Sequence, residues 1–283
     1  MTLQILFLFL FGAVLGSFLN VLILRYELGG VVFGRQLKGR SRCPHCDKIL
    51  SWYELIPIIS FIAQFGKCRN CREKISLQYP IVEIMSGIIV ATIPQMLGFT
   101  PFALIWAAAL LVLLVISFID IRHYVIPDAL TIIITLLGGA SAIIIATGDV
   151  PLFTLIPGTF LGDYAFVFSF TDNLWFARLF AAFVGGAFFS SIILLSRGKA
   201  MGWGDAKLIM AIGILIGWPD ALLVMIIAFI IGAIVGMIML VGKKKKFKDA
   251  LPFGPFIALG VMMVVYFGYD IISLYFRFLH LGV

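Results

Sequence analysis

Apolar residues form long runs along this chain, and short polar stretches separate them. Transmembrane helices need about 20 apolar residues, and in lipid the backbone must satisfy its own hydrogen bonds. The pattern therefore predicts an all-α polytopic membrane protein with about eight transmembrane helices. The predicted helices lie near residues 3–24, 81–98, 101–119, 129–146, 176–195, 206–217 (short), 221–241 and 253–276.

Composition agrees with this pattern. The 283 residues are 62% hydrophobic and 12% charged, and their mean hydropathy of +1.13 exceeds what a soluble domain needs. No basic segment precedes the first apolar run, and Ser17 and Asn20 interrupt it. These features favour a retained first helix over a cleaved signal peptide.

Lysine and arginine are distributed unevenly around the predicted helices. Eight spans place most of them on one side, in residues 25–80, around Arg122, in 197–207 and in 243–248. The positive-inside rule makes this side cytoplasmic and puts both termini outside, in a multi-pass inner-membrane protein. The net charge of +7 then reflects topology and attraction to lipid headgroups, not nucleic-acid binding. The run Lys243–Lys246 is expected to be a stop-transfer anchor.

One sizeable polar segment, residues 25–80, separates a first transmembrane helix (1–24) from a membrane bundle (81–283). It contains the chain's four cysteines as two C-x-x-C pairs: Cys43, Cys46, Cys68 and Cys71. Such pairs present two sulfurs to one ion, which predicts a tetrahedral structural zinc site in a cytoplasmic domain. Disulfides and metal-free thiols are the alternatives, and disulfides are disfavoured in a reducing cytoplasm.

Two aspartates stand out in the apolar part of the chain. Asp120 closes one long apolar run, and Asp205 opens another after Gly202-Trp203-Gly204. A carboxylate at membrane depth is expensive and indicates function. The topology puts both on the cytoplasmic side, where a pair sharing one proton could perform aspartic hydrolysis. Helix dipoles would favour Asp205 as the ionised partner and Asp120 as the protonated one.

The other acidic residues have simpler explanations. Asp128, after Ile126-Pro127, is expected to cap a helix N-terminus, and Asp220 to form a cap or turn on the outer face. Glu83 is either a surface group that reaches the headgroups or part of a second site.

Carboxylates in a helix bundle also suit a proton-coupled secondary transporter. Against transport, the two halves of the chain show no internal repeat and no paired broken helices. A third hypothesis, a membrane-anchored zinc-binding scaffold, leaves both aspartates without a role.

Several motifs in order resemble one family from end to end. They are Gly16-Ser17-Phe18-Leu19-Asn20, the two cysteine pairs, Gln78-Tyr79-Pro80-Ile81-Val82-Glu83, Asp120 with Ile126-Pro127-Asp128, Gly202-Trp203-Gly204-Asp205, and Pro252-Phe253-Gly254-Pro255. The chain resembles the type IV prepilin peptidases of type IV pilus and type II secretion systems.

The resemblance implies a bifunctional enzyme. Asp120 and Asp205 would be the catalytic pair that removes the leader of a prepilin or pseudopilin on the cytoplasmic side, after a glycine. The new N-terminus would then be methylated from S-adenosylmethionine. The four cysteines match the zinc-bearing form of the cytoplasmic domain. The resemblance assigns neither the methyltransferase residues nor the loop 147–175.

Overall fold

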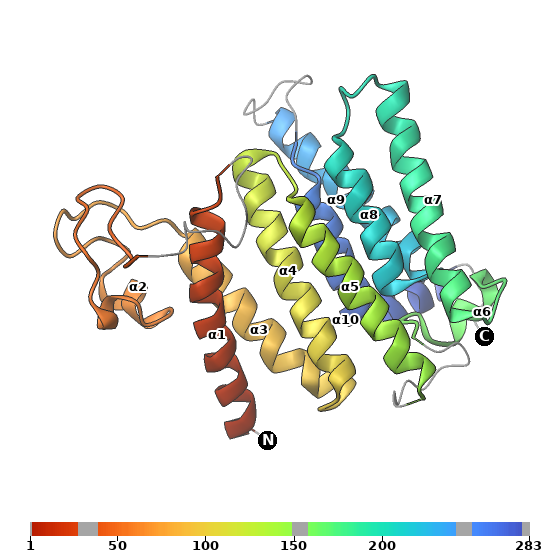
Figure 1. Ribbon diagram of the computed structural model, residues 1–283, viewed down its shortest axis with the longest axis horizontal. Helices are drawn as coiled ribbons and strands as arrows, with labels where there is room; N and C mark the ends of the chain where they lie inside the picture. Colours follow the sequence, from red (N-terminus) through yellow and green to blue (C-terminus); the bar gives the residue numbers. More distant parts are fainter. Residues whose placement is uncertain (1, 28–38, 149–157, 242–250, 279–283) are drawn as a thin grey trace. The chain divides into compact units, whose positions relative to one another are not determined.

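The computed structural model describes residues 2–27, 39–148, 158–241 and 251–278, and these are almost entirely helical (Figure 1). Two isolated β-bridges are the extent of strand pairing in these ranges. The long helices are α1 (Thr2–Leu24), α3 (Gln78–Leu97), α4 (Pro101–His123), α5 (Asp128–Ala146), α7 (Leu174–Leu195), α8 (Trp203–Ile216), α9 (Asp220–Val241) and α10 (Gly254–Phe278). The short ones are α2 (Ile59–Ala63), α6 (Ala165–Phe168) and 3₁₀ turns at Trp52–Glu54 and Gly162–Tyr164.

The prediction of an all-α membrane protein is confirmed. Each of the eight predicted helices is present, and seven are long and apolar enough to cross a bilayer. The exception is α8, whose 14 residues extend about 21 Å and fall short of the hydrocarbon thickness. The lysine run 243–246 lies outside the described residues.

The chain divides into two compact units, Met1–Ala107 and Ala108–Val283. In the first unit α1 packs along α3 at unusually close range. A Cβ added to Gly16 would lie 2.8 Å from the Cα of Glu83, and one added to Gly12 would lie 2.9 Å from the Cα of Gly87. Small residues allow such backbone approach in membranes, where no hydrophobic effect drives helices together.

In the second unit α8 packs against both α5 and α7. A Cβ on Gly138 would lie 2.8 Å from the Cα of Leu215, and a Cβ on Gly213 would lie 2.6 Å from the Cα of Ala182. The glycines thus bring three backbones close together. The contacts of Gly185 with Ile209 and of Gly213 with Ala182 show that α7 and α8 are antiparallel.

A buried arginine joins the same three helices. Arg178 of α7 is 2% exposed, and its Nη1 donates to the carbonyl oxygens of Gly138 and Ile214 and, at 2.8 Å, to the hydroxyl of Ser141. Since an uncompensated charge in the bundle is costly, these acceptors stabilise the packing of α5, α7 and α8.

Asp220 does more than the cap or turn predicted from the sequence. It is the first residue of α9 and is 1% exposed. Its carboxylate accepts hydrogen bonds from the Thr159 hydroxyl at 2.6 Å and the Phe160 amide at 2.7 Å. The described end of the loop 147–175 is therefore held to the start of α9.

We predict that Gly213→Ala destabilises the protein, because the new Cβ would meet the backbone of α7. Overpacking of this kind costs about 1–3 kcal/mol. Thermal unfolding in detergent measures the effect. The matched control is Gly139→Ala in α5, where a Cβ meets nothing within 4 Å. Equal unfolding temperatures for the two variants would contradict the proposed α7–α8 contact.

Candidate functional site: two buried aspartates and a four-cysteine cluster

Asp120 lies in the last turn of α4 and is 4% exposed. Its Oδ2 accepts a hydrogen bond of 2.9 Å from the backbone N–H of Gly254, the first residue of α10. A Cβ on Gly254 would lie 2.8 Å from that same oxygen. Glycine is therefore required for α10 to approach the carboxylate, and the N-terminal end of the α10 dipole points at it.

Asp205 is the third residue of α8 and is 8% exposed. Its Oδ2 accepts the N–H of Gly202 at 3.1 Å, so the carboxylate also satisfies a free donor at the start of its own helix. From the antiparallel contacts, Asp205 is level with Phe189 or Ser190 of α7. It therefore lies about 8 Å, or five to six residues, below the end of α7 at Leu195.

The two aspartates belong to the same unit, and the charge of Asp120 acts electrostatically on Asp205. The sequence predicted that these two helix ends could meet, and the catalytic role of the pair stays a prediction. Two buried carboxyl groups in electrostatic contact do not both ionise readily, which is the chemical requirement for a shared-proton pair.

The turn Ile126-Pro127-Asp128 leads from α4, which carries Asp120, into α5, which packs against α8. Ile126 packs against Gly204, since a Cβ added to Gly204 would lie 3.2 Å from the Cβ of Ile126. The prediction that Asp128 caps α5 was wrong, because Pro127 occupies the N-cap and Asp128 is the first helical residue. Its exposed carboxylate instead pairs with the Lys207 ammonium at 2.8 and 3.0 Å. The ion pair links the start of α5 to α8, two residues beyond Asp205.

The four cysteines form one cluster, in which all four sulfur atoms lie within 4.8 Å of one another. The Cys43 and Cys71 sulfurs are 3.8 Å apart. A tetrahedral zinc with Zn–S bonds of about 2.3 Å has S···S edges of about 3.8 Å, so the donor type and the spacing both fit zinc. Disulfides are absent among these residues, since all four cysteines are free.

The two C-x-x-C turns have the same backbone geometry. In each turn, the carbonyl oxygen of the first cysteine accepts a hydrogen bond from the backbone N–H four residues later, and its own N–H donates to the carbonyl oxygen five residues later. The partners are Asp47 and Lys48 for Cys43, and Arg72 and Glu73 for Cys68. Asp47 and Arg72 both have positive φ, 52° and 59°.

Hydrogen bonds also prepare a thiolate in this cluster. The Lys48 backbone and then the Asn70 side chain lower the pKa of the Cys46 thiol to about 6. A lowered thiol pKa is what a metal ligand requires.

Glu83 is not the surface group that one hypothesis predicted. It is 6% exposed and accepts a 2.7 Å bond from the backbone N–H of Ile58, as well as one from the Ser17 hydroxyl. It joins α1, α3 and the cysteine-containing segment within the first unit.

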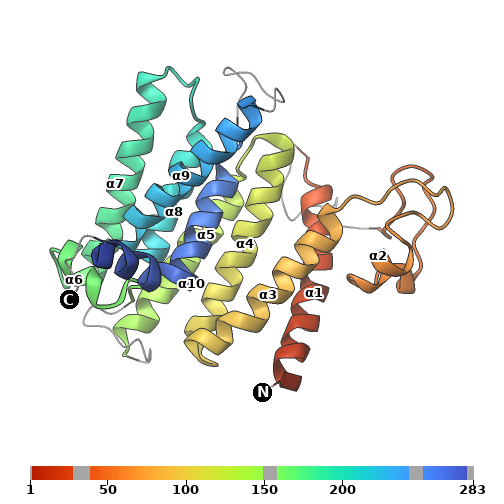
Figure 2. The same ribbon diagram turned by 180° about the vertical axis from the view of Figure 1, so that it is seen from behind.

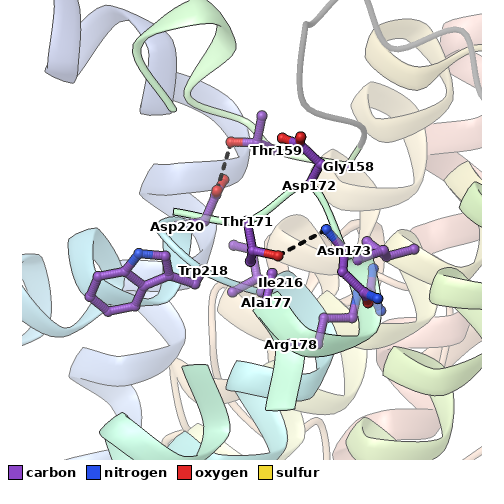
Figure 3. Close-up of a pocket in the computed structure, with 12 residues that line it drawn as sticks. Gly158, Thr159, Thr171, Asp172, Asn173, Ala177, Arg178, Ile216, Trp218 and Asp220 are labelled. Atoms are coloured by element: carbon purple, nitrogen blue, oxygen red, sulfur yellow. Dashed lines mark hydrogen bonds between the residues drawn. The ribbon is translucent and has the colours of Figure 1, made fainter. Parts of the chain in front are cut away.

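The second unit also contains a small pocket (Figure 3). It is lined by polar groups that include Asp172, Asn173, Arg178 and Asp220. The pocket also touches Ile216, eleven residues beyond Asp205 along α8, which is about 16 Å. It therefore contributes nothing to the acid pair.

Comparison with known proteins gives two matching family models. The Bacterial Peptidase A24 N-terminal domain matches residues 10–96, and the Type IV leader peptidase family matches residues 107–237. No solved structure matches the chain.

Among curated relatives, the prepilin leader peptidase/N-methyltransferase of Burkholderia pseudomallei (strain 1026b) is 30% identical, over 94% of this chain and 86% of its own. Proteins with the same name from Stutzerimonas stutzeri (29%; 95% and 93% covered) and Bacillus subtilis strain 168 (28%; 95% and 97%) are also similar. The chain belongs to the type IV leader peptidase family. The resemblance noted in the motifs and the predicted peptidase class are thereby confirmed.

We predict that protein purified without chelators contains about one zinc per chain, because four thiolates fill one tetrahedral site. Cys43→Ser and Cys71→Ser should each lose the metal and loosen residues 39–77, since metal binding supplies folding energy to small domains. Elemental analysis and limited proteolysis measure both effects, with His45→Ala as the zinc-retaining control. Wild-type protein free of zinc would refute the assignment.

Proposed function

We propose that this protein removes the leader of type IV prepilins or pseudopilins and then methylates the new N-terminal residue. The relatives' names carry both activities. The observation that supports the peptidase most directly is the pair of buried carboxyl groups, Asp120 and Asp205, in electrostatic contact.

In the proposed mechanism one aspartate is ionised and the other is protonated. The ionised carboxylate removes a proton from water as the water oxygen attacks the scissile carbonyl carbon. The protonated partner donates a hydrogen bond to the carbonyl oxygen, where negative charge develops. The C–N bond then breaks, and the leaving nitrogen takes up a proton from the pair.

Each aspartate is positioned by a backbone N–H, Gly254 for Asp120 and Gly202 for Asp205. Backbone donors are fixed by their helices, so the carboxylates need little reorganisation during the reaction. The Lys207–Asp128 ion pair positions the start of α5 beside this region.

The distribution of lysine and arginine supports a site that faces the cytoplasm from the inner membrane, with both termini on the other side. We propose S-adenosylmethionine as the methyl donor and assign no methyltransferase residues. Zinc at Cys43, Cys46, Cys68 and Cys71 would hold the insertion together and take no part in either reaction. Family membership disfavours the transporter hypothesis.

We predict that Asp120→Asn and Asp205→Asn each abolish leader removal from a synthetic prepilin, measured by mass spectrometry with purified protein in detergent. The losses should not add in the double variant, because the carboxylates act as a unit. Asp128→Asn is the control. It retains substantial activity, because its exposed side chain only pairs with Lys207. Cleavage near the wild-type rate by either single variant would remove that aspartate from the mechanism.

A subtler test uses the glycine beside Asp120. Gly254→Ala would place a Cβ 2.8 Å from the carboxylate oxygen and displace it. Misplacing a catalytic group by an ångström costs up to about a hundredfold, so we predict a kcat reduced roughly tenfold to a hundredfold, with little change in KM. Gly236→Ala in α9, where the nearest atom is 3.7 Å away, is the neutral control. Unchanged kcat in Gly254→Ala would show that α10 does not position Asp120.

A further inference from the structure

A short helix in the cysteine-containing segment exposes its apolar side chains. In α2 (Ile59–Ala63), Ile59 is 61% exposed and Ile62 is 66% exposed. Phe65, just after the helix, is 90% exposed. The spacing puts Ile59 and Ile62 one turn apart on the same helix face. Three large apolar groups in one seven-residue stretch are unusual for a surface in contact with water.

The backbone at both ends of α2 is strained. Ile58, the residue before the helix, has φ 64°, and Phe65, two residues after it, has φ 51°. At the C-terminal end, the Gly66 N–H bonds to the Phe61 carbonyl and the Phe65 N–H to the Ile62 carbonyl. This is a Schellman motif with phenylalanine at the left-handed position that glycine usually occupies. A phenylalanine kept in this conformation with its ring exposed requires a compensating interaction.

A hydrogen bond ties the start of α2 to a candidate membrane span. The backbone N–H of Ile58 donates to Oε2 of Glu83 at 2.7 Å. Glu83 is the sixth residue of the candidate span α3, about 7.5 Å along its axis from Gln78. Interfacial helices lie about 5–10 Å into the boundary between headgroups and acyl chains. Within this unit, both views show α2 at a level between the two ends of α1 (Figures 1 and 2).

Positive charge lies immediately beside the apolar turn. Lys67 and Lys74, both exposed, face each other across an isolated β-bridge. The Ile75 N–H bonds to the Gly66 carbonyl, which fixes this bridge next to Phe65. Exposed apolar side chains next to a pair of lysines match the chemistry of an anionic bilayer surface, where acyl chains lie beside the headgroup phosphates.

We propose that α2 and Phe65 form an interfacial membrane anchor, in which Ile59, Ile62 and Phe65 insert among acyl chains and Lys67 and Lys74 contact anionic headgroups. The anchor holds the cysteine cluster against the bilayer on the side where α1 ends and α3 begins. The alternative occupant is an apolar segment of a prepilin. It has less support, because the lysine pair matches a phosphate surface better than an apolar peptide.

Photocrosslinking in nanodiscs tests the proposal with the full-length protein. p-Benzoylphenylalanine replaces Phe65 in one sample and exposed His45 of the first cysteine turn in another. Intact-mass spectrometry after irradiation should show phospholipid adducts at position 65, roughly tenfold more than at position 45. Replacing phosphatidylglycerol with phosphatidylcholine should lower the yield several-fold. Equal yields at the two positions, or adducts to an added prepilin in place of lipid, would overturn the proposal.

Hydrogen exchange separates lipid contact from folding. Phe65→Gly removes the backbone strain, so its unfolding temperature in detergent should equal or exceed that of the wild type. In nanodiscs the amides of residues 59–66 should nevertheless exchange roughly tenfold faster, because the inserted ring is gone. Phe65→Leu, which keeps an apolar side chain, should exchange slowly like the wild type. Identical exchange in wild type and Phe65→Gly would show that Phe65 does not insert.

Discussion

A carboxylate buried among apolar helices has to find its hydrogen-bond donors inside the protein, and this constraint organises the structure around each one. Asp120 accepts a hydrogen bond from the first N–H of α10, and Glu83 accepts one from the N–H of Ile58. Asp220 accepts hydrogen bonds from the hydroxyl of Thr159 and the N–H of Phe160, both in a loop. In each case the donor belongs to a segment distant in sequence. Satisfying the acid therefore also fixes where that segment lies, since an unsatisfied buried charge is costly.

Glycine makes these approaches possible. Gly254 allows α10 to reach Asp120, and Gly138 and Gly213 bring the backbones of α5 and α7 against α8, whose first turn carries Asp205. Because helix association in a membrane depends on close packing and polar contacts, the same small residues serve both stability and the acid pair. Rigid helices that converge in this way give the carboxylates a fixed geometry without support from flexible loops.

The sequence predicted the features that depend on local pattern. Apolar runs located all eight long helices, and two C-x-x-C pairs predicted a cluster that the structure forms. Contacts between segments far apart in the chain could not be predicted from the sequence. The local sequence around Asp128 does not indicate that its carboxylate pairs with Lys207 and does not cap a helix. The dipole argument for protonating Asp120 considered only α4, whereas the N-terminus of α10 also acts on that residue. The proton assignment therefore stays a prediction. The motif Pro252-Phe253-Gly254-Pro255 was visible, but only packing connects it to Asp120.

The shortness of α8 has a consequence for any peptide that reaches Asp205. The aspartate lies about 8 Å below the end of α7, a distance that a helix covers in five to six residues. An extended chain advances about 3.3 Å per residue and covers it in two or three. A peptide bond inside a helix is also shielded by its own hydrogen bonds, so a scissile bond has to be unwound before water attacks it. The depth of the aspartate thus corresponds to two or three residues of unwound substrate, and a peptide that stays helical up to its cleavage point would not present its scissile bond to water.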